Sequence, residues 1–199
     1  MTREILKAKE AMMNRRMNSA KGSRVMRNIV LYKSRYGNTK QYATWIAEEL
    51  GWELRDFSEF RKSEISDYQN IIFGSGVYMG RMNGMRKVLE WFKDKPILIF
   101  ACAGNNNVEK DIEDIRRSNF TKEQLSFHRF FYVPGGVDFR KVGGIYKAML
   151  NVFRKVMERK KSMTPDEKAI LEGFDHPTSY VDKRHIDAIV SYARERQLK

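Results

Sequence analysis

The sequence predicts an α/β fold in which helices cover both faces of a parallel sheet. From residue 28 onward, apolar runs typical of strands alternate with amphipathic helical patterns. The run 96–103 (PILIFACA) is apolar throughout, as expected for a strand that is buried on both faces. This alternation predicts a three-layer, doubly wound sheet. With 199 residues, the chain is long enough for one domain with a sizeable core.

Five strands and the helices between them are expected in chain order. The strands are 28–33, 52–57, 70–74, 96–103 and 129–133, and the helices are 39–50, 85–92 and 108–117. The first helix places Ala43, Ile46, Ala47 and Leu50 on one face and should end at Gly51. The segment after the fifth strand, about 137–178, exceeds a minimal five-strand plan and is expected to be a helical insertion.

Two helical signals lie in the insertion and a third follows it. Residues 141–161 form a basic helical stretch, and Thr164 with Glu167 has the spacing of a capping box. Residues 183–196 are amphipathic, with Asp182 as the expected cap. The domain is therefore expected to span 28–199.

The net charge of +13 is concentrated in two segments. Residues 1–27 hold eight Lys or Arg against two Glu, and residues 139–162 hold eight against one. The first segment is expected to be a basic extension, either disordered or helical. This pattern suggests docking onto an anionic membrane face, an acidic partner or nucleic acid. No aromatic-interleaved RNA motif or recognition-helix pattern is present, so no specific nucleic acid is expected.

The apolar runs, the N-terminus, and the number and spacing of the cysteine and histidines favour a cytoplasmic protein without a metal site. No apolar run approaches the ~18 residues that span a bilayer, and the polar N-terminus has no signal-peptide core. Cys102 is the single cysteine, which excludes an internal disulfide. His128, His176 and His185 share no metal-ligand spacing with each other or with that cysteine.

The loop between the first strand and the first helix (34–39, SRYGNT) has the character of an anion site. A helix N-terminus presents unpaired N–H groups and a partial positive charge. A glycine lets the backbone approach an anion closely, and hydroxyl and amide side chains can donate further bonds. Neither a P-loop nor a G-x-G-x-x-G dinucleotide motif is present. The loop therefore suits a single terminal phosphate, although an ordinary strand-to-helix turn is the alternative.

Two further loops follow strands whose carboxyl ends should meet at the same edge of the sheet. The third strand ends in GSGVYMGRMNG (74–84), and the fourth ends in CAGNNN (102–107). Small residues allow close backbone approach, and Tyr78 could stack on a flat ring. The predicted cofactor-binding residues are Ser34, Arg35, Tyr36, Gly37, Asn38, Thr39, Ser75, Gly76, Val77, Tyr78, Met79, Gly80, Ala103, Gly104 and Asn105.

These loops resemble those of the flavodoxin superfamily, whose phosphate loop typically reads [ST]-x-T-G-x-T. The resemblance covers residues 28–196 and implies the strand order 2-1-3-4-5 and an FMN cofactor whose phosphate is held by Ser34, Gly37, Asn38 and Thr39. Tyr36 stands where the family usually has threonine. The basic insertion is similar to that of the group including bacterial menaquinone-dependent protoporphyrinogen oxidase. That likeness implies a tetrapyrrole substrate and a quinone.

Two functions are consistent with this pattern. In the first, the chain is an FMN-dependent oxidoreductase, with Arg35 and Arg81 contacting an anionic substrate and the basic helix 141–161 resting on the inner face of a membrane. In the second, it is a non-enzymatic electron carrier between redox proteins. Such carriers surround the flavin with acidic residues, whereas the segment 74–89 has no carboxylate. The first function is therefore preferred. No side chain is identified as a general acid or base.

Overall fold

The structure is a computed structural model that describes residues 26–104, 108–137, 144–160, 162–164, 167–168, 171, 174 and 178–197. Five parallel strands form its centre in the order β2-β1-β3-β5-β6, which confirms the predicted doubly wound order. They are β1 (Arg27–Lys33), β2 (Glu53–Asp56), β3 (Tyr68–Tyr78), β5 (Leu98–Ala103) and β6 (Arg129–Pro134). A two-residue strand, β4 (Arg81–Met82), pairs antiparallel with the end of β3.

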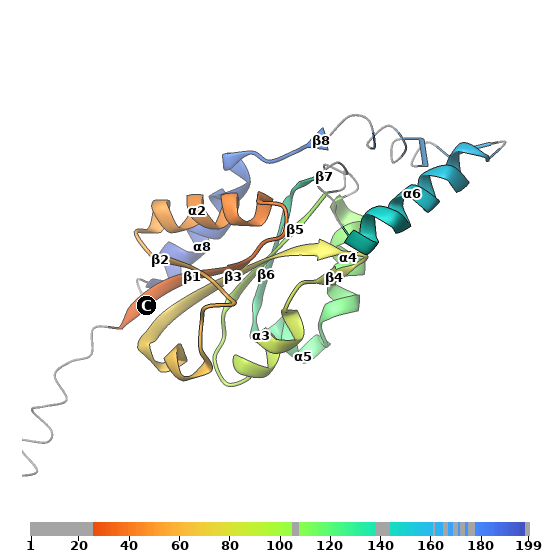
Figure 1. Ribbon diagram of the computed structural model, residues 1–199. Coiled ribbons are helices and arrows are strands. Elements are labelled where there is room, and N and C mark those ends of the chain that lie inside the picture. The colour runs from red at the N-terminus through yellow and green to blue at the C-terminus, as the bar shows by residue number, and fades with distance from the viewer. Residues whose placement is uncertain are drawn as a thin grey trace, which may run out of the picture.

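Helices cover both faces of this sheet (Figure 1). On one face lie α2 (Asn38–Leu50) and α8 (Asp187–Gln197), and on the other lie α3 (Met85–Trp91), α4 (Val108–Asn119) and α5 (Lys122–Phe127). Helix α2 ends where Gly51 adopts a left-handed conformation at φ 65°, as its sequence predicts. This arrangement is the three-layer architecture expected from the strand–helix alternation.

Alternate residues of each strand enter two separate hydrophobic cores. Ile29, Ile71 and Ile99 join the core beneath α3, α4 and α5. Val30 and Ile72, one position along in their strands, join the core beneath α2 and α8. Because successive side chains of a strand point to opposite faces, a strand buried on both faces must be apolar at every position.

The pairing of β3 with β5 includes one position, Gly74, where there is no room for a side chain. Gly74 of β3 pairs with Phe100 of β5, and the Phe100 ring occupies the space beside the glycine. A Cβ atom on Gly74 would lie 2.0 Å from the ring. The phenylalanine is fully buried, so the ring has no alternative position on this face without repacking the core.

The structure differs from the predicted elements at several places. The third strand continues through Tyr78, because Ser75 and Gly76 still pair with neighbouring strands and the last two residues pair with β4. Helix α5 was not predicted, although its capping box of Thr121 and Gln124 is complete. A short 3-10 helix at Lys62–Asp67 and a small sheet of β7 (Gly136–Val137) and β8 (Thr178–Ser179) were also not predicted.

The predicted basic helix is α6 (Gly144–Glu158), which runs outward from the sheet (Figure 1). The capping box is also present, because the Thr164 hydroxyl accepts from the Glu167 N–H at 3.3 Å. The final predicted helix begins as a 3-10 turn at Lys183–Ile186, capped by Asp182, before continuing as α8. The basic extension was predicted over residues 1–27, of which 1–25 lie outside the described residues and Arg27 already belongs to β1.

Replacing Gly74 with alanine should test the β3–β5 junction. This glycine has no positive φ, so the substitution introduces a clash with Phe100 and little backbone strain. We expect the free energy of unfolding of Gly74→Ala to fall by about 1–3 kcal/mol or more in urea denaturation. The double variant Gly74→Ala/Phe100→Leu should lose less than the two single variants together. Unchanged stability in the single variant would contradict the packing described here.

Candidate cofactor site at the carboxyl ends of the strands

The predicted phosphate loop lies between the end of β1 and the start of α2. Gly37 has φ 100°, and a Cβ atom there would meet no atom within 4 Å, so the space before the helix is open. The Ser34 hydroxyl accepts from the Gly37 N–H at 3.1 Å and fixes the turn. The first-turn N–H groups that follow have no acceptor within the helix, and no acidic side chain lies in that turn. The loop therefore presents free donors to an anion.

The first two side chains of α2, Asn38 and Thr39, form contacts with other segments of the protein. Asn38 donates through its amide nitrogen to the Gly136 carbonyl at 2.9 Å. Thr39 is 3% exposed, and its hydroxyl hydrogen-bonds the thiol of Cys102 on β5. Burial raises the pKa of that thiol to about 12, so the thiol is uncharged at neutral pH. Asn38 therefore ties the helix N-terminus to β7, and Thr39 ties it to the end of β5.

Tyr42, one turn further along α2, connects three segments through its hydroxyl. It donates to the Pro134 carbonyl at 2.6 Å and accepts from the Asp182 N–H at 3.2 Å. His185 Nδ1 lies 3.1 Å from the same oxygen. Burial raises the pKa of Tyr42 to about 12, which keeps the hydroxyl protonated as a donor. The sequence analysis did not predict this role, although the position of Tyr42 on the apolar face of α2 was readable.

An aromatic and cationic cluster borders the loop. The rings of Tyr36 and Tyr78 meet edge to face with centroids 5.9 Å apart. The Arg35 guanidinium lies over both, at 5.7 Å from the first ring and 5.8 Å from the second. Burial, which the nearby Arg35 opposes, raises the pKa of Tyr78 to about 12. The structure thus brings Arg35 and Tyr36 of the first loop against Tyr78, which is about forty residues further along the chain.

Tyr78 folds back along its own strand. Its hydroxyl lies 3.0 Å from the position that a Cβ atom on Gly76 would occupy, so the glycine makes room for the ring. The neighbouring Ser75 is fully buried, and its hydroxyl donates to the Asn83 carbonyl at 2.7 Å. Ser75 therefore has a clear structural role in holding the turn that follows β3.

The tip of the β3–β4 turn is anchored to the end of α4. Asn119 donates to the Gly80 carbonyl at 2.7 Å and accepts from the Met82 N–H at 2.9 Å. Met79, at the tip, has a positive φ of 50° and is 85% exposed. Arg81 donates to the Ser118 carbonyl at 2.6 Å. Arg35 and Arg81, both predicted to contact substrate, therefore contact different parts of the protein in this structure.

The third segment bordering the site, after the 34–39 loop and the β3–β4 turn, is the junction between the ends of β5 and β6. Ala103 ends β5, and its carbonyl accepts from the Gly135 N–H at 2.6 Å. A Cβ atom on Gly135 would lie 2.9 Å from the Cys102 sulfur, so only glycine fits there. The sequence Pro134-Gly135-Gly136 was read only as the end of a strand, yet it contacts α2. Asn105, also predicted as a cofactor ligand, lies outside the described residues.

The electrostatic character of this edge is basic. Within the described parts of the three loops, 34–39, 75–84 and 103–104, there is no carboxylate side chain. Arg35 and the positive end of α2 lie on the same side of the opening. No group of three or more His, Cys, Asp or Glu side chains that could hold a metal ion occurs in the described part of the chain.

Parts of this chain are similar to known proteins. The chain is 34% identical over 83 residues to an uncharacterized protein of Methanocaldococcus jannaschii, which covers 40% of this chain and 55% of that protein. It is similar to flavodoxin 2 of Bacillus cereus, with 17% identity, coverage of 54% and 84%, and a TM-score of 0.40. It is also similar to a flavoprotein of Lactobacillus acidophilus solved with FMN, with 19% identity, coverage of 55% and 93%, and a TM-score of 0.38.

The match to a protein family is more extensive than these pairwise similarities. The model of the flavodoxin domain family matches residues 29–164. This range runs from β1 through the sheet and into the insertion, and it contains all the loops described above. The chain therefore belongs to the flavodoxin domain family.

Proposed function

We propose that this chain binds FMN and acts as an FMN-dependent oxidoreductase. The observation that carries the proposal is the open, carboxylate-free first turn of α2, with the cluster of Arg35, Tyr36 and Tyr78 beside it. A bound flavin would supply the redox chemistry, and the protein would position it and tune its potential.

The residues present fit FMN. The sequence alone does not show which contacts come from backbone groups and which from side chains. The space at Gly37 is open, and the first-turn N–H groups of α2 are available to phosphate oxygens. The Asn38 amide nitrogen and the Thr39 hydroxyl already bond Gly136 and Cys102. Their backbone N–H groups would therefore make the main phosphate contacts, and Tyr36 or Tyr78 would supply an aromatic face for the ring.

A comparison of FMN with riboflavin should test the phosphate site. The two ligands differ only in the phosphate, whose charge-assisted hydrogen bonds are each worth ~1.5–3 kcal/mol. We expect fluorescence titration of the flavin-free protein to show FMN binding at least roughly a hundredfold more tightly than riboflavin. Gly37→Ala should weaken FMN binding, because a left-handed backbone at this position strains any Cβ-bearing residue. Equal affinities for the two flavins would overturn the proposed cofactor.

The charge around the ring site favours an enzyme over a low-potential carrier. A reduced flavin is an anion at neutral pH, and nearby carboxylates would disfavour it, whereas Arg35 and the end of α2 stabilise it. Because the described loops carry no carboxylate, this field should raise the potential of a bound flavin. The non-enzymatic carrier remains the second candidate, and the potential distinguishes the two.

Replacing Arg35 with glutamine should lower the midpoint potential of the bound cofactor. Removing one positive charge near the ring changes the energy of the reduced anion by on the order of 1 kcal/mol, which corresponds to tens of millivolts. The control Arg86→Gln removes the same charge from the exposed surface of α3, so the potential should stay close to that of the wild type. A wild-type potential well below that of free FMN, unaffected by Arg35→Gln, would instead support the carrier.

We also propose that the redox partner is reached at an anionic membrane surface, with a protoporphyrinogen-like donor and a quinone acceptor. The support comes from α6, where Val152 is 63% exposed, Phe153 40% and Val156 59%. Arg154, Lys155 and Arg159 lie on or next to the same turns. Exposed apolar and basic side chains on one helix suit the interface of an anionic bilayer. No helix in the described ranges is long and apolar enough to cross the bilayer itself.

Binding to lipid vesicles should test whether the protein docks on an anionic membrane. The protein is expected to sediment with vesicles containing phosphatidylglycerol, less with neutral phosphatidylcholine vesicles, and less again in high salt. The variant Val152→Ser/Phe153→Ser/Val156→Ser should lose binding, and with it menaquinone-dependent oxidation of protoporphyrinogen in vesicles. The control Phe127→Ser, at an exposed aromatic on α5, should retain both. Wild-type turnover with a water-soluble acceptor but none with menaquinone would contradict the membrane proposal alone.

A further inference from the structure

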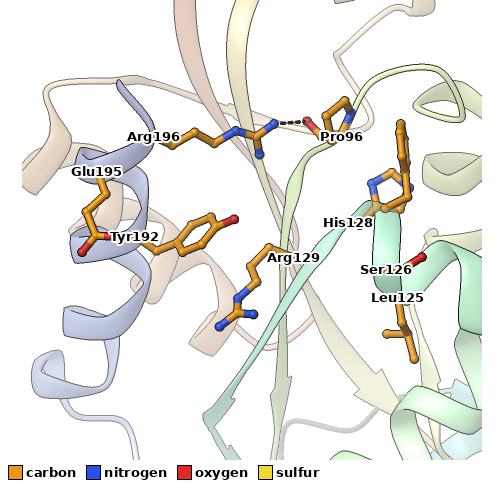
Figure 2. A pocket seen from close by; sticks show the side chains of 9 residues that line it. Pro96, Leu125, Ser126, His128, Arg129, Tyr192, Glu195 and Arg196 are labelled. Atoms are coloured by element: carbon orange, nitrogen blue, oxygen red, sulfur yellow. Dashed lines mark hydrogen bonds between the residues drawn. The ribbon is translucent and has the colours of Figure 1, made fainter. Parts of the chain in front are cut away.

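A hollow lies at the other end of the sheet from the cofactor site. It occupies about 470 Å³ beside Pro96 and Arg129, at the amino ends of β5 and β6. This volume is within the range of small-molecule sites, ~300–1,000 Å³. Figure 2 shows side chains of α8 on one side and of the α5–β6 junction on the other. Two arginines and a tyrosine extend into the space between them.

The two arginines are held in place but keep most of their hydrogen-bonding capacity. The Arg129 guanidinium lies 5.5 Å from the ring centroid of Phe131 and 5.2 Å from that of Tyr192. Arg196 donates through Nη2 to the Pro96 carbonyl at 3.4 Å, a long contact that leaves its other N–H groups available. Neither forms an ion pair within the described chain, and Figure 2 shows the Glu195 carboxylate turned away from both. The lining of the hollow therefore has a net positive charge, with two arginines against one glutamate.

The opposite wall carries a histidine, His128, whose ring is largely enclosed. His128 is 4% exposed, and its Nδ1 accepts from the Ile97 N–H at 3.4 Å. Burial lowers the pKa of His128, so the ring is neutral at neutral pH and carries its proton on Nε2. That N–H has no acceptor among the described residues, and the ring borders the hollow (Figure 2). This N–H can therefore donate to a ligand in the hollow that carries an acceptor oxygen.

The rest of the lining determines what kind of ligand fits. Leu125 and the 42% exposed ring of Phe127 provide an apolar wall next to the charged groups. Guanidinium, phenol and imidazole donors together suit an anion with several acceptor oxygens, for which phosphate is better matched than a carboxylate. We propose that the hollow between α8 and the α5–β6 junction binds the phosphate of a small phosphomonoester whose ring or apolar part packs on Phe127 and Leu125.

Histidine-selective NMR of the full chain should test this site, with inorganic phosphate, methyl phosphate and phenyl phosphate as probes. Each should shift the ring signals of His128 in a saturable manner, and phenyl phosphate should bind most tightly because its ring contacts the apolar wall. Arg129→Gln and Arg196→Gln should each weaken binding roughly tenfold. Tyr192→Phe, which removes only a hydroxyl, should weaken it by about threefold.

The controls separate a built site from general attraction to a basic protein. Lys62→Gln removes one charge from an exposed position that does not line the hollow and should leave phosphate binding unchanged. Thermal unfolding of each arginine variant shows whether the loss of binding is a loss of folding, and Tyr192→Phe provides the milder test. No saturable shift of the His128 signals, or equal loss in Lys62→Gln, would overturn the site. Equal affinities for inorganic and phenyl phosphate would overturn the phosphomonoester assignment.

Discussion

The position of the α2 N-terminus is the constraint on which the cofactor site depends. Three side chains of one helix fix it: Asn38 to Gly136, Thr39 to Cys102 and Tyr42 to Pro134. These bonds reach the ends of β5 and β6 and the start of β7. The positive end of the helix therefore cannot move away from the sheet without breaking buried hydrogen bonds, each costing ~1–3 kcal/mol to leave unmade.

The elements with a strong local signal could be predicted from the sequence, and those stabilised by distant contacts could not. The strand 96–103 is apolar at every position, and α2 combines an apolar face with Gly51 as a stop, so both were predicted close to their observed bounds. The sequence analysis ended the third strand at residue 74 because Ser75 and Gly76 have weak strand propensity. Pairing with β1 and β5 overrides that propensity. The complete capping box of α5 was a readable signal that the analysis missed.

The same holds for the candidate site: its loops could be located from local sequence motifs, but the contacts between distant residues could not. Motif reasoning located the three loops, because the carboxyl ends of parallel strands meet at one edge. It could not show that Asn119 anchors the β3–β4 turn or that Tyr42 reaches Asp182, since each pair is far apart in the chain. Arg35 and Arg81 appeared equivalent in the sequence. They differ in the structure because one lies over aromatic rings and the other bonds the end of α4.

The burial of Cys102 has a practical consequence for studies of this protein. The cysteine is 6% exposed, Gly135 lies directly against its sulfur, and the Thr39 hydroxyl occupies its remaining polar contact. An alkylating reagent can reach this sulfur only when α2 and the end of β6 separate. Because this is the single thiol of the chain, the rate of its modification reports the opening of that one junction, and no engineered probe is required.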